Sequence, residues 1–114
     1  MIVKSEAAKE ISFEGLTIRD YTPGHDRSSS LATVEVPPGV QHRKARSTRS
    51  DKYYYVIEGK IRFTLGDAEN HLEEGDFCLV PKGVHFAYRN NTQVMAVLLL
   101  LHTPSFDLSA EVFE

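Results

Sequence analysis

The side chains best suited to chemistry gather in one short basic segment. Residues 42–52 carry five cationic side chains and one acidic side chain, so this segment has a net charge of +4 while the whole chain has −3. The rest of the chain therefore carries −7, which gives no general attraction to nucleic acid. The segment could be a solvated loop, a patch for intermolecular salt bridges or an anion-binding rim, and the solvated loop is the simplest interpretation. Its cations are Arg43, Lys44, Arg46, Arg49 and Lys52.

The elements that would position such side chains are short strands. Runs of apolar, aromatic and β-branched residues alternate with turn residues, and an amphipathic helical period is hard to find. Eight or nine short strands with frequent turns predict an all-β sandwich or barrel. The predicted strands cover residues 11–21 (one or two strands around Gly15), 31–36, 52–58, 61–65, 77–80, 84–89 and 93–102.

Two of these strands, residues 53–57 and 94–101, are apolar on both faces. A closed small barrel needs only its inner face to be apolar. The outer face of these strands therefore needs a cover, and we expect a homodimer that packs through a sheet face. A chain of 114 residues suffices for one domain with its own core.

The spacing of glycine, proline and asparagine resembles the two motifs of the cupins, specifically the small single-domain cupins. Gly39 and Gly59 frame the segment in which the first motif places His-x-His and Glu. In the second motif, Gly75, the turn at residues 81–83 and Asn90 stand at the family's spacings. The fifteen residues from 60 to 74 match the short gap between the motifs of small bacterial cupins.

This resemblance covers residues 31–107 and implies a jelly-roll β-barrel, a double-stranded β-helix, with a ligand pocket inside it. Residues 1–114 are then a single cupin domain. It divides into N-terminal strands and a loop (1–30), the barrel core (31–107) and a tail (108–114).

The family's metal ligands, three histidines and one glutamate, are missing from their motif positions. The four positions hold Ala45, Ser47, Lys52 and Phe86. None is a good ligand for a divalent transition metal, which prefers imidazole, thiolate or carboxylate. We therefore expect no metal and no other cofactor.

A rebuilt metal site is the alternative. It would use His42, Asp51, His85 and His102. Such a site requires a register slip that exchanges Phe86 for His85, and a slip of this kind inverts every side chain on its strand.

In the family's register, strand alternation from the ligand positions predicts which side chains line the pocket. They form an apolar pocket with two phenols, a hydroxyl and one or more cations, which suits a small aromatic or acyl ligand that carries a carboxylate, phosphate or sulfate. Alternatively, the aromatic side chains simply fill the barrel. The predicted pocket residues are Ser47, Lys52, Tyr54, Phe86 and Tyr88, with Arg43 and Arg49 at the mouth.

Lys52 is the most informative of these residues, because a buried amine is costly unless it is paired or neutralised. We expect it to pair with Asp51, Glu35 or an anionic group of a ligand. The alternative is that its amine reaches the rim of the barrel.

Three function classes follow. The first is metal-independent binding of a small anionic or aromatic molecule, in a sensor or accessory domain. The second is a metal-free isomerase or epimerase of the sugar-nucleotide type, with Tyr54, Tyr88 and Lys52 as acid–base candidates. The third is a metal-dependent dioxygenase or isomerase with altered ligands. The sequence does not decide whether the chain is an enzyme.

Residues 1–6 do not begin a long apolar segment, so we expect no signal peptide. The longest apolar run, residues 94–101, is too short to span a bilayer as a helix. We expect a cytoplasmic protein whose partners are a small molecule and a second copy of the chain, with no membrane or nucleic acid partner.

Overall fold

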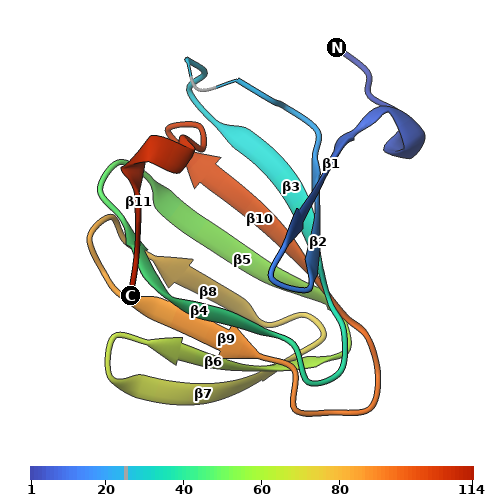
Figure 1. Cartoon of the computed structure of the whole chain (residues 1–114), viewed down its shortest axis with the longest axis vertical. Coiled ribbons are helices and arrows are strands. Elements are labelled where there is room, and N and C mark those ends of the chain that lie inside the picture. The colour runs from blue at the N-terminus through green and yellow to red at the C-terminus, as the bar shows by residue number, and fades with distance from the viewer. Residues whose placement is uncertain (25) are drawn as a thin grey trace.

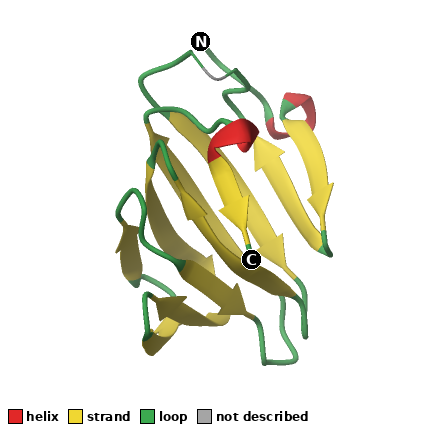
Figure 2. Cartoon of the chain, turned by 60° about the vertical axis from the view of Figure 1, so that its left-hand side comes forward, coloured by secondary structure: helices red, strands yellow, loops and turns green. Residues whose placement is uncertain are grey.

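Two antiparallel sheets face each other and form the jelly-roll β-barrel that the sequence predicts. The computed structural model describes residues 1–24 and 26–114, and this part of the chain contains eleven strands (Figures 1 and 2). The first sheet has the order β1 (Lys9–Phe13), β2 (Leu16–Asp20), β3 (Ser30–Val36), β10 (Ala96–Thr103), β5 (Asp51–Glu58) and β8 (Phe77–Val80). The second has the order β11 (Glu111–Phe113), β4 (Gln41–Ser47), β9 (Phe86–Arg89), β6 (Lys60–Leu65) and β7 (Ala68–Glu73).

Helical structure is limited to short 3₁₀ turns in the described ranges, η1 (Ser5–Ala7) and η2 (Leu108–Ala110). No helix in residues 1–24 or 26–114 has the length and apolar character needed to cross a membrane.

The sequence patterns do not predict three of these strands. β4 covers the first half of the basic segment, so the interpretation of that segment as a solvated loop is wrong there. β7 is mostly polar and mostly exposed, and it pairs along its length with β6. β11 lies in the segment divided off as a tail, where pairing with β4 holds it in the second sheet. All three depend on a neighbouring strand rather than on an apolar pattern of their own.

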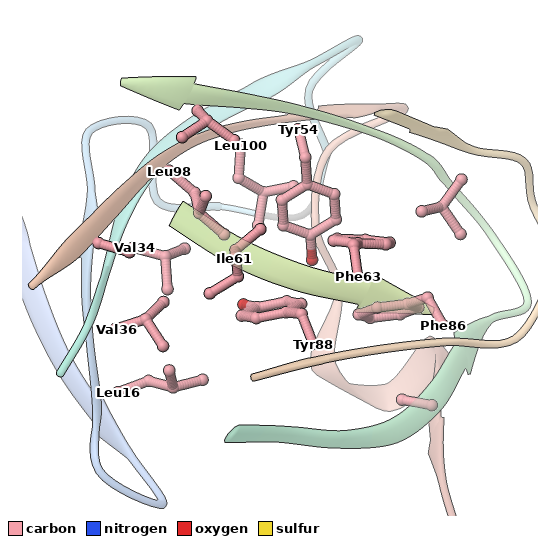
Figure 3. Packing of buried hydrophobic residues seen from close by; sticks show 14 residues of the cluster. Leu16, Val34, Val36, Tyr54, Ile61, Phe63, Phe86, Tyr88, Leu98 and Leu100 are labelled. Carbon is pink, nitrogen blue, oxygen red and sulfur yellow. The ribbon is translucent and has the colours of Figure 1, made fainter. Parts of the chain in front are cut away.

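Aromatic rings fill one side of the barrel interior (Figure 3). The rings of Phe63 and Phe86 stack at 6.2 Å between centroids, and Tyr54 meets Phe63 edge-on at 5.2 Å. Aliphatic side chains such as Val34 and Leu98 fill the side opposite (Figure 3). Phe86, which the family's register placed in the pocket, is therefore a core residue with 1% of its surface exposed.

The outer face of the first sheet is apolar. Val97, Leu99 and Leu101 of β10 point to this face, while the residues between them are buried in the barrel. Two rows of apolar side chains run from β10 across the neighbouring strand β5, because Leu99 pairs with Tyr55 and Leu101 pairs with Tyr53. The same rows reach Phe77 and Leu79 on β8. Extended exposed apolar surfaces are typical of interaction sites.

We expect a second copy of the chain to cover this face. Light scattering is then expected to return about twice the chain mass of 12.8 kDa. Leu99→Asp would bury an unpaired carboxylate in that contact and is expected to give a monomer. Thr64→Asp, which adds the same charge to the outer face of the second sheet, is the control and should stay dimeric. A parent protein that scatters as a single chain would contradict the expectation.

Candidate functional site

A cavity of about 340 Å³ is lined by the first sheet, including its β1–β2 hairpin, by β4 and β9 of the second sheet and by the C-terminal segment. This volume is in the range of small-molecule sites. Its walls are mostly carbon, from side chains such as Phe13, Leu100 and Phe113. Its polar groups include His42, Lys52, Tyr54, Tyr88, His102 and Glu111.

A β-bulge in β4 turns His42 into the cavity. His42 pairs with Tyr88 and Ala45 pairs with Phe86, so two residues of β4 lie opposite the single residue Ala87 of β9. A bulge of this type shifts the alternation of the strand by one residue. His42 and Ala45 therefore share a face, although simple alternation would put them on opposite faces.

Arg43, expected at the pocket mouth by the same alternation, instead lies on the exposed side of β4. Its guanidinium is 3.6 Å from Glu14 and also donates to the backbone oxygen of Glu114. Its guanidinium also lies 5.6 Å from the ring centroid of Phe113, which lines the cavity. The bulge in β4 rather than simple alternation sets the place of Arg43, and its part in ligand binding stays a prediction.

The imidazole of His42 sits among aromatic rings. Its centroid lies 4.9 Å from that of Phe86, 5.1 Å from that of Tyr88 and 5.6 Å from that of Phe13. Nδ1 is 2.7 Å from the carbonyl oxygen of Arg43, which can only accept, so Nδ1 carries the proton and Nε2 is left as an acceptor. Burial lowers the pKa of His42 to about 4, and the positive charge of Lys52 adds to this effect. The imidazole is therefore neutral at pH 7 and able to take a proton.

Lys52 is buried at the cavity wall between two partners. Its Nζ donates to Oε1 of Glu111 at 2.6 Å and to Nε2 of His102 at 2.9 Å. Lys52 and His102 pair directly across β5 and β10, and Glu111 reaches the ammonium from β11. Burial lowers the pKa of Lys52, while Glu111 opposes that shift. Burial and the nearby ammonium lower the pKa of His102 to about 2, so its imidazole stays neutral and accepts.

The partner of Lys52 is thus Glu111, and the two sequence candidates are wrong. Asp51 instead accepts from the backbone N–H of Lys82 at 2.8 Å. Glu35 lies 3.9 Å from Arg19, between the buried residues Val34 and Val36 on β3 and therefore on the outer face of the first sheet. No local pattern pointed to Glu111, because it becomes a neighbour of Lys52 only when β11 pairs with β4.

Tyr54 and Tyr88 contribute two phenols to the cavity wall. Their rings meet edge-on with centroids 5.5 Å apart. Burial raises the pKa of both hydroxyls, so both phenols stay protonated, and the two hydroxyls also hydrogen-bond to each other. With Lys52, these are the predicted pocket residues that the structure places on this cavity.

The other predicted pocket residues have structural contacts elsewhere. The hydroxyl of Ser47 accepts from the backbone N–H groups of Arg49 and Ser50 at 3.2 and 2.9 Å. Arg49 donates from Nε to the carbonyl oxygen of Ser105 at 3.0 Å. These contacts fix the turn between β4 and β5, which is a structural task rather than a place on the cavity wall.

The residues of the alternative metal site do not come together. His42 and His102 line the cavity, but His85 contacts the carboxylate of Glu114 at 2.7 Å on an exposed surface. No three His, Cys, Asp or Glu side chains in residues 1–24 and 26–114 are grouped so that they could hold a metal ion. The donors within the described residues therefore do not fit the metal that the motif spacing implies.

Sequence comparison finds one matching family model and a relative. The model described as "Cupin domain" matches residues 32–102. An uncharacterized protein of Aquifex aeolicus (strain VF5) is 41% identical over 78 residues, which are 68% of this chain and 57% of that protein. The chain thus spans less than two thirds of that relative's length.

Structure comparison finds similar barrels among solved proteins. The nucleoside dehydratase Pac13 has a TM-score of 0.87 at 21% identity, covering 100% of this chain and 90% of that chain. Streptomyces PAC13 is also known with uridine, in variants that replace a histidine by glutamine or a tyrosine by phenylalanine. A predicted oxalate decarboxylase of Thermotoga maritima has a TM-score of 0.81 at 16% identity, covering 91% of this chain and 99% of that chain. At such identities the likeness is one of fold.

Proposed function

This chain belongs to the cupin family, and on that premise we propose that it binds a small, uncharged, ring-containing molecule in its cavity without a metal ion. One observation carries the proposal: the 2.6 Å contact between Lys52 and Glu111 inside a mostly apolar cavity. The ammonium already has a carboxylate partner, so it does not require an anionic ligand. What remains for a ligand is a set of ring faces, two phenols and a neutral imidazole, which suit an uncharged aromatic or sugar ring.

A nucleoside is the ligand class that we favour. Support comes from Pac13, which is a nucleoside dehydratase and is known with uridine in histidine and tyrosine variants. The cavity of the present chain presents the same residue types in His42, Tyr54 and Tyr88. Aromatic rings stack on a nucleobase, and the phenols can donate to its oxygens or to those of the ribose.

Metal-free proton transfer is a second candidate function, favoured by the state of His42. A neutral imidazole with Nε2 as acceptor can remove a proton from a bound ligand, and a protonated phenol can donate one. This pairing suits isomerisation or epimerisation of a sugar-like ring. A metal-dependent reaction has less support, because the donor set described above does not fit a metal ion.

Calorimetry with uridine tests the proposal on protein treated with a chelator. Uridine is expected to bind the parent, and His42→Gln is expected to weaken binding at least fivefold. Loss of one stacking ring costs about 1–3 kcal/mol, which corresponds to roughly 5- to 150-fold in Kd. His71→Gln changes an exposed residue of β7 and is the matched control, with unchanged affinity. If the parent protein binds no uridine at millimolar uridine concentration, the nucleoside proposal is wrong.

A further inference from the structure

We propose, building on that function, that Glu111 determines the charge selectivity of the cavity. Its carboxylate occupies the place beside Lys52 that an anionic group of a ligand would otherwise take. The cavity would therefore admit uncharged molecules and reject their phosphorylated or carboxylated forms. Specificity of this kind comes from a repulsive element as much as from attractive contacts.

The contacts of the Lys52 ammonium support this role, because other groups already surround it. Glu111 and His102 accept two of its three N–H bonds. The rings of Phe86 and Phe106 cover further sides, with centroids 5.3 and 5.7 Å from Nζ. The side chains of Lys52 and Glu111 are only 3% and 4% exposed, so water does little to weaken their attraction. An incoming anion would have to displace the carboxylate of Glu111.

The charge balance of the cavity wall points the same way. In the described part of the chain, the acidic and basic residues of the wall are Asp20, Lys52 and Glu111, with a net charge of −1. An anionic ligand would meet a like charge in a mostly apolar space, where repulsion is strong. Without the carboxylate of Glu111 the balance changes to 0, and Lys52 becomes a buried cation that needs a partner.

The position of Glu111 in the fold makes it a specificity element separate from the barrel core. It lies on β11, which pairs with the edge of β4 at Ser47, Arg46 and Ala45. The same C-terminal segment adds Phe106, Leu108 and Phe113 to the cavity wall. A change at Glu111 therefore alters the charge of the wall and leaves the stacked rings of the core in place.

Rescue by acetate tests the inference without reference to any nucleoside. Glu111→Ala removes the carboxylate, and acetate is expected to take its place beside Lys52. Acetate at ten times its Kd is then expected to raise the Tm of Glu111→Ala by about 5 °C. The parent and the double variant Lys52→Met/Glu111→Ala are expected to show no such rise, and chloride at equal ionic strength is the control for salt. If Glu111→Ala is unfolded on its own, acetate is expected to restore its fold.

Calorimetry with uridine and uridine monophosphate tests the selectivity itself. The parent is expected to bind uridine at least tenfold more tightly than the monophosphate, and Glu111→Gln is expected to reverse that order. Absence of acetate rescue overturns the inference, whether or not uridine binds. Acetate rescue without uridine binding to the parent would overturn the proposed function and leave the role of Glu111 supported.

Discussion

Lys52→Met lowers the free energy of unfolding by about 3–5 kcal/mol, which is the expected cost of breaking one side of a buried ion pair. The methionine fills much of the space of the lysine stem but offers no proton to Glu111. The carboxylate, 4% exposed in the parent, is then left without the 2.6 Å contact that compensates its burial. Urea denaturation at neutral pH measures the loss directly.

Two further variants separate this charge effect from simple loss of packing. Lys52→Met/Glu111→Leu removes both charges and is expected to recover most of the stability, because an apolar replacement of a buried pair is often neutral. Arg19→Met breaks the partly exposed pairs of Arg19 with Glu10 at 3.1 Å and with Glu35 at 3.9 Å, and is expected to cost less than about 1 kcal/mol. If Lys52→Met costs no more than Arg19→Met, the buried pair is not the stabilising contact described here.

The protein loses stability as the pH falls below 6.5, because two histidines stay neutral in the fold but take up protons when the chain unfolds. Burial lowers the pKa of His42 to about 4 and that of His102 to about 2, both from the ordinary histidine value of 6.5. Between pH 6.5 and the folded pKa, the unfolded chain binds the extra proton, so acid favours unfolding. Each histidine lowers the free energy of unfolding by about 1.4 kcal/mol for each pH unit of acidification in this range. For His42 the loss is roughly 3 kcal/mol between pH 6.5 and 4.

Denaturant titrations of the parent and His102→Asn at pH values between 6.5 and 4 test this dependence. The variant lacks the imidazole, so the stability advantage of the parent should shrink by about 1.4 kcal/mol per unit as the pH falls. His71→Asn, an exposed residue of β7, is the control and should follow the parent. A difference between parent and His102→Asn that stays constant over this range would contradict the burial of a neutral imidazole beside Lys52.

The barrel itself was predictable from the sequence, since its strand pattern and turn residues are local signals. Gly59 is an example: its φ is 78°, and a Cβ there would lie 2.7 Å from the carbonyl oxygen of Met95. Only glycine adopts this positive φ without strain and also leaves room for the carbonyl oxygen at this turn between β5 and β6. The alternation of β5 and β9 likewise predicts that Lys52, Tyr54 and Tyr88 face inward, because a regular strand keeps its period of two.

The cavity, in contrast, depends on contacts between segments that are distant in the sequence. The bulge that exchanges the places of His42 and Arg43 exists only in the pairing of β4 with β9. Glu111 lies 59 residues from Lys52 and reaches it through a three-residue strand that no pattern predicts. Alternation is a property of one strand, whereas a bulge and a cross-barrel ion pair are properties of how strands meet. The sequence by itself therefore determined the barrel and the inward ammonium, and only the tertiary structure decided that this ammonium is already neutralised.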